Sequence, residues 1–83
     1  IGIANAGSRW FFASGENGLP WFNSIKVRNY SNCNISCNGT TVFPSQEQMI
    51  FGDEMFISTS CFFSLRASYY KDGSTLVVFI EKN

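Results

Sequence analysis

The cysteines are the most reactive side chains in this chain of 83 residues, and there are three of them, Cys33, Cys37 and Cys61. On a regular strand Cys33 and Cys37 would lie roughly 13 Å apart, because four residues advance ~3.4 Å each. A disulfide needs Cα atoms within about 7 Å of one another. The spacing therefore predicts a disulfide from Cys61 to either Cys37 or Cys33, with one thiol left over. The alternative is three reduced thiols packed in a core.

Acid–base and metal chemistry have few candidates in this sequence. Histidine is absent, which removes the Ser-His-Asp and Cys-His arrangements and the commonest general base near neutral pH. The only adjacent carboxylates are Asp53 and Glu54, and successive residues of a strand face opposite sides. Three cysteines without histidine do not make the usual zinc set, although oxygens of Asp53, Glu54 or Asp72 leave a weak calcium site open. We expect a non-enzymatic protein without a cofactor or a metal.

An aromatic loop is the strongest candidate for a binding site. Residues 14–20 are rich in turn formers, and Trp21 and Phe22 follow directly. An exposed indole offers a flat surface for the apolar face of a sugar, while nearby amide and carboxylate groups can hydrogen-bond its hydroxyls. The predicted ligand-binding residues are Trp21, Phe22, Asn17, Asn23 and Glu16. The competing interpretation is that these rings belong to the core, because a small domain needs aromatic side chains there.

Three kinds of binding function are compatible with this loop and composition. The first is recognition of a carbohydrate or cell-surface ligand, as in a lectin. The second is a defence protein, toxin or effector that inserts the aromatic loop into a membrane or a pocket of a host protein. The third is a structural or adhesion module acting through self-association as a homodimer, for which Val77 and Phe79 form a predicted exposed apolar pair.

Charge and hydropathy argue against nucleic-acid binding and against a membrane-spanning helix. Six basic and six acidic residues balance, and the basic ones are scattered singly rather than gathered in the patch that a nucleic-acid binder needs. The longest apolar run, Leu76 to Ile80, is far shorter than the roughly 20 residues of a membrane-spanning helix. We therefore expect neither nucleic-acid binding nor a transmembrane segment.

Several features favour a secreted glycoprotein. The chain begins at Ile1, which is expected after removal of a signal peptide or an expression tag. Three N-x-S/T sequons begin at Asn29, Asn34 and Asn38, and they predict glycosylation at these residues. The alternative is that a chain rich in Asn and Ser contains sequons by chance.

The elements that must position these residues are strands. Side chains from residue 55 to residue 69 alternate between apolar and polar with a period of two, as in a half-buried strand. Asn38-Gly39 and Asp72-Gly73 are type I′ turn signals, because both central residues of such a turn need positive φ. The second turn places Tyr69 opposite Leu76, Ala67 opposite Val78 and Leu65 opposite Ile80. The first places Cys37 opposite Thr40, Ile35 opposite Val42 and Cys33 opposite Pro44.

The predicted fold class follows from these hairpins. Short alternating segments separated by regular turn signals indicate an all-β protein, a small antiparallel β-sandwich or barrel of about 6–8 short strands. Eighty-three residues suffice for one core, so residues 1–83 are expected to form a single β domain.

Overall fold

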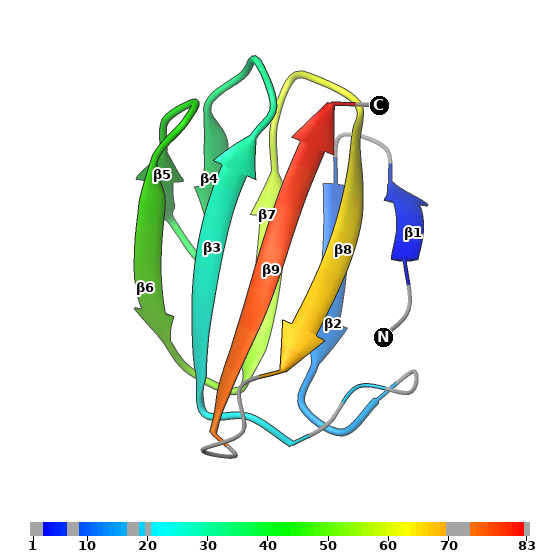
Figure 1. Cartoon of the computed structure of the whole chain (residues 1–83), viewed down its shortest axis with the longest axis vertical. Helices are drawn as coiled ribbons and strands as arrows, with labels where there is room; N and C mark the ends of the chain where they lie inside the picture. Colours follow the sequence, from blue (N-terminus) through cyan, green and yellow to red (C-terminus); the bar gives the residue numbers. More distant parts are fainter. Residues whose placement is uncertain (1–2, 7–8, 17–18, 20, 70–73, 83) are drawn as a thin grey trace.

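Two β-sheets face each other in the computed structural model, which describes residues 3–6, 9–16, 19, 21–69 and 74–82 (Figure 1). These residues form nine strands and no helix. The strands are β1 (Ile3–Ala6), β2 (Arg9–Ala13), β3 (Ser24–Tyr30), β4 (Ile35–Cys37), β5 (Thr40–Val42), β6 (Glu47–Phe51), β7 (Glu54–Ser58), β8 (Phe63–Tyr69) and β9 (Thr75–Lys82). The predicted all-β class is confirmed, and the form is a sandwich and not a closed barrel.

The strand order differs from a simple succession of hairpins. One sheet has five strands in the order β1-β8-β9-β3-β6, and the other has four in the order β2-β7-β4-β5. All neighbouring strands are antiparallel except β3 and β9, which run parallel with Ile25 opposite Leu76. This central parallel pair joins the first half of the chain to its last strand.

The hairpin at Asn38-Gly39 has the predicted turn and most of the predicted register. Cys37 lies opposite Thr40, and Ile35 lies opposite Val42. Asn38 has φ 50° and Gly39 has φ 81°, as a type I′ turn requires at both central positions. The ladder ends at Ile35 and Val42, so the predicted pairing of Cys33 with Pro44 is wrong.

The hairpin formed by β8 and β9 has the predicted register throughout. Tyr69 lies opposite Leu76, Ala67 opposite Val78 and Leu65 opposite Ile80. The turn at Asp72-Gly73 itself lies outside the described residues. Because the apolar side chains of a strand share one face, this register places the apolar faces of β8 and β9 side by side, and both point toward the second sheet.

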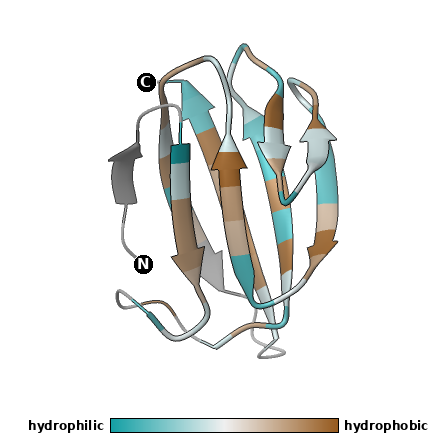
Figure 2. Ribbon diagram, turned by 180° about the vertical axis from the view of Figure 1, so that it is seen from behind, coloured by the Kyte–Doolittle hydropathy of each residue, from teal (hydrophilic) through white to brown (hydrophobic). Residues whose placement is uncertain are grey.

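The core fills the space between the two sheets. Alternation along the strands supplies it, and Figure 2 shows hydrophobic and hydrophilic residues following one another along several of them. Its largest fully buried apolar side chains are Phe63, Ile25, Ile35, Met55, Ile57, Leu76, Ile80, Val27, Val42, Val78 and Cys37. Phe12 and Phe22 extend this core toward the aromatic loop.

Candidate functional site

The aromatic loop between β2 and β3 is fixed at both ends by Ser14. The buried Ser14 hydroxyl accepts a hydrogen bond of 2.7 Å from the backbone N–H of Phe22. The backbone N–H of Ser14 donates to the carbonyl of Asp53 at 2.7 Å. Phe22 is buried, and its ring meets that of Phe12 edge-on with centroids 6.2 Å apart. The loop therefore leaves the core and returns to it at defined positions.

Trp21 is held against the backbone while most of its surface faces solvent. Its exposed fraction is 75%. Gly15 has φ +75°, and a Cβ added there would lie 2.8 Å from Cε2 of the Trp21 indole. Because that distance is too short for any side chain, only glycine allows the ring to sit so close to the loop. The indole is thus an exposed surface that its own loop supports.

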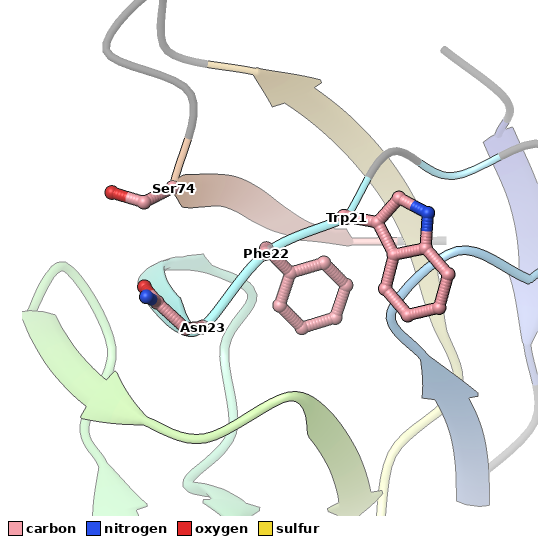
Figure 3. Close-up of a pocket in the computed structure, with 4 residues that line it drawn as sticks. All are labelled: Trp21, Phe22, Asn23 and Ser74. Carbon is pink, nitrogen blue, oxygen red and sulfur yellow. The ribbon is translucent and has the colours of Figure 1, made fainter.

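A shallow hollow of about 210 Å³ adjoins this ring, lined by Trp21, Phe22, Asn23 and Ser74. In Figure 3 the rings of Trp21 and Phe22 lie to one side of the 21–23 segment, and the polar ends of Asn23 and Ser74 to the other. Backbone hydrogen bonds join the chain segments around the hollow. The N–H of Asn23 donates to the carbonyl of Ser74 at 2.9 Å, and the N–H of Gly52 donates to the carbonyl of Asn23 at 2.9 Å.

The predicted binding residues fall into three groups. Trp21, Asn23 and Glu16 are exposed. Phe22 is buried, so its ring supports the loop and offers little surface to a ligand. Asn17 lies outside the described residues. Ser74 completes the hollow and was not predicted, because it reaches Asn23 only through the parallel pairing of β3 with β9.

Asn29, in the first sequon, is a structural residue. It is fully buried, and its Nδ2 donates to the carbonyls of Cys33 and Val42, both at 2.9 Å. Its Oδ1 accepts from the backbone N–H and the hydroxyl of Ser31. Both amide hydrogens are used and no surface is exposed, which argues against a glycan at Asn29 in this fold.

The other two sequons lie at the surface. Asn38 bridges to β7, because its Nδ2 donates to the carbonyl of Glu54 at 2.9 Å and its Oδ1 accepts from the N–H of Phe56 at 2.8 Å. Asn34 is exposed in the connection between β3 and β4, where its carbonyl accepts from the Thr59 hydroxyl. Asn34 is therefore the sequon whose side chain is best placed to carry a glycan.

The disulfide joins Cys33 to Cys61, with Cα atoms 6.3 Å apart. Of the two predicted partners of Cys61, the structure selects Cys33. The bond links the connection after β3 to the connection after β7, and these strands belong to different sheets. Cys37 keeps its thiol and is completely buried in the core.

Burial raises the pKa of the Cys37 thiol from its ordinary 9.0 to about 12. We expect no reaction with iodoacetamide at mildly alkaline pH in the native protein and one alkylated thiol after unfolding, as read by mass spectrometry. Because the pKa of this thiol is higher in the folded protein than in the unfolded chain, the protonated thiol contributes to the stability of the fold below pH 9.0. That contribution is lost as the pH rises toward about 12. A Cys37→Ala variant should show no labelling in either state. Equal labelling rates in native and unfolded protein would contradict this burial.

The predicted apolar pair for a homodimer is not exposed. Val77 is only 3% exposed. The Phe79 ring lies between two guanidinium groups, 4.3 Å from that of Arg66 and 5.9 Å from that of Arg28. It also stacks on Tyr30 with centroids 6.2 Å apart. Since Val77 is buried and Phe79 lies against cationic side chains, the prediction of an apolar dimer surface at Val77 and Phe79 is wrong.

A small ion-pair network continues across the same face. Glu47 contacts Arg28 at 2.7 Å and Lys26 at 3.2 Å. The hydrogen bond from Lys26 is the main cause of a lowered pKa at the Glu47 carboxyl. Exposed pairs of this kind contribute little stability in water.

Other kinds of site find no support in the described part of the chain. It holds no group of three or more His, Cys, Asp or Glu side chains arranged for a metal ion. It also contains no helix with the length and hydrophobicity needed to span a bilayer. The loop with Trp21 is thus the candidate site.

Comparisons with protein-family models, curated proteins and solved structures find no match to this chain. The class that the fold defines is a small β-sandwich with one disulfide between the connections at one end of its two sheets.

Proposed function

We propose that this protein is a secreted, non-enzymatic binding module that recognises a carbohydrate or cell-surface glycan through Trp21. The observation that carries the proposal is the exposed indole supported by Gly15. An aromatic ring that is already held in place loses little conformational freedom when a ligand binds, so more of the contact energy appears as affinity.

The surroundings of Trp21 suit a ligand with both apolar and hydroxylated surface. The indole supplies the flat apolar part. Asn23 and Ser74 line the adjoining hollow, and Glu16 is exposed on the same loop. Amide, hydroxyl and carboxylate groups together can both donate to and accept from sugar hydroxyls.

Secretion and glycosylation are parts of the same proposal. A disulfide persists in oxidising compartments outside the cytosol, and the exposed sequon at Asn34 fits a glycoprotein. A second function uses the same ring, because an exposed Trp also suits the membrane boundary or a host-protein pocket, as in a defence protein, toxin or effector. Asn23 and Ser74, which line the hollow next to Trp21, favour the glycan.

The test is a broad glycan array probed with the labelled protein and with Trp21→Ala. We expect binding to one sugar family, weakened by about 30-fold or more in the variant, as for the loss of an interface hot spot. Gly15→Ala should also weaken binding, because its Cβ would displace the indole. Phe62→Ala is the matched control, since Phe62 is 71% exposed in the connection between β7 and β8. This connection lies at the end of the molecule opposite the one between β2 and β3 (Figure 1).

Two results would overturn the glycan proposal. One is a silent array with protein shown to be folded by its circular dichroism. The other is binding that survives Trp21→Ala unchanged. Leakage from neutral lipid vesicles that Trp21→Ala abolishes would favour the membrane function instead.

A further inference from the structure

Among the described strands, β6 forms an edge of the five-stranded sheet and pairs with β3 alone (Figure 1). Its inner hydrogen bonds are known from the pairs at its ends. The N–H of Asn29 donates to the carbonyl of Gln46, and the N–H of Gly52 donates to the carbonyl of Asn23. Since the bonding direction alternates along a strand, Gln48 and Ile50 bond to β3, and the backbone groups of residues 47, 49 and 51 point outward.

The side chains of this edge are unusually apolar for an exposed strand. Phe51 is 82% exposed and Met49 is 44% exposed, and both lie on the outer face of the sheet. Phe51 is the most exposed large hydrophobic side chain of the described residues. Burying these two side chains against another surface would remove apolar area from water.

Natural edge strands usually carry a feature that prevents pairing with another chain, such as a proline, a bulge or an unpaired charge. The pairing of β3 with β6 runs without a bulge from Ser24–Phe51 to Arg28–Glu47, and β6 contains no proline. Its one charged residue, Glu47, is already bound by Lys26 and Arg28 of its own sheet. By contrast, the β5 edge has only three residues, too few for an extended ladder with another chain.

We propose that β6 pairs antiparallel with β6 of a second copy of this chain, about a two-fold axis at Met49, and joins the two five-stranded sheets into one. In this register Met49 lies opposite Met49 of the second copy, and Glu47 lies opposite Phe51. Residues 47, 49 and 51 of each chain then exchange hydrogen bonds through their outward backbone groups.

The length of β6 selects this register and fits a second copy, because all five residues of β6 then face the five residues of the same strand in the other copy. Moving the axis by one residue toward Phe51 would place Glu47 opposite Asp53, which lies beyond the end of β6, and would leave Glu47 and Gln48 of each copy outside the paired segment. Moving it the other way would place Phe51 opposite Ser45 and remove the central contact between the two Met49 side chains. With the axis at Met49, the same strand supplies both halves of a self-complementary interface.

The experiment is sedimentation equilibrium of the full chain from about 10 µM to about 1 mM, the range expected for a weak interface. Met49→Pro removes an outward N–H and leaves the bonds to β3 in place, because proline is tolerated on the open side of an edge strand. Phe51→Lys adds a charge without touching the core. Phe62→Lys is the matched control at another exposed phenylalanine.

We expect a reversible dimer of the parent chain and of Phe62→Lys, with at least ~tenfold weaker association in Phe51→Lys and in Met49→Pro. A parent chain that stays monomeric across the range would overturn the proposal. A dimer that persists unchanged in Phe51→Lys would also overturn it, whatever the state of Met49→Pro. No sugar enters this measurement, so its outcome is independent of the proposed glycan binding.

Discussion

Replacing Asn29 by aspartate is expected to lower the free energy of unfolding by about 3–4 kcal/mol. The Asn29 amide is fully buried and donates to the carbonyls of Cys33 and Val42. Aspartate has nearly the same shape, but it puts a second oxygen where the donor was. The carbonyls of Cys33 and Val42 both lose this donor and face a negative charge, and a buried group left unsatisfied costs about 1–3 kcal/mol.

Urea unfolding followed by tryptophan fluorescence measures this loss. The matched control is Asn34→Asp, an exposed asparagine in the neighbouring connection, with an expected change within about 0.5 kcal/mol. The deficit of Asn29→Asp should shrink at acid pH, because a protonated carboxyl can donate to one of the two carbonyls. Equal stability of the two variants at neutral pH would show that Asn29 does not join β3 to the chain around Val42 as the structure indicates.

Features set by local chemistry could be predicted from the sequence. The Asn38-Gly39 turn is specified by two adjacent residues that tolerate positive φ, and it determines the pairing of Ile35 with Val42. The register of β8 with β9 follows from alternation on both strands. The inward position of Asn29 was also within reach, because the alternation that places Ile25 and Val27 inside continues to residue 29. The sequon at Asn29 predicts a surface position instead, and of these two signals the alternation is the one that agrees with its burial.

Features that depend on distant parts of the chain could not be predicted. The parallel pairing of β3 with β9 joins residues about fifty positions apart, and no turn residue specifies it. Ser74 reaches the candidate site only through that pairing. The support of Trp21 by Gly15 depends on the path of the whole loop, so the sequence marks the aromatic residues but not which ring is exposed. The alternation along β9 predicts that Val77 lies on the outer face of the sheet, and this leads to the expectation that it is exposed. Alternation alone does not show which neighbouring side chains cover that position.

Removal of the disulfide by the double replacement Cys33→Ala and Cys61→Ala is expected to cost about 3.5 kcal/mol of stability without loss of the fold. The bond spans 28 positions, and its main effect is to restrict the unfolded chain. The two connections that it joins are also held by a hydrogen bond of 2.9 Å from the Thr59 hydroxyl to the carbonyl of Asn34. The native arrangement therefore has a second support when the sulfurs are gone.

Guanidinium unfolding with and without a reductant separates this disulfide from the alternative to Cys37. The parent chain should lose stability on reduction, and the double variant should not respond. Cys37→Ala should lose stability through its cavity but keep the full response to the reductant, because Cys37 lies buried away from the bond. A Cys37→Ala variant that ignores the reductant would show that Cys61 pairs with Cys37. A denaturant slope that rises in the double variant would place the effect in the unfolded state, since an uncrosslinked chain exposes more surface when it unfolds.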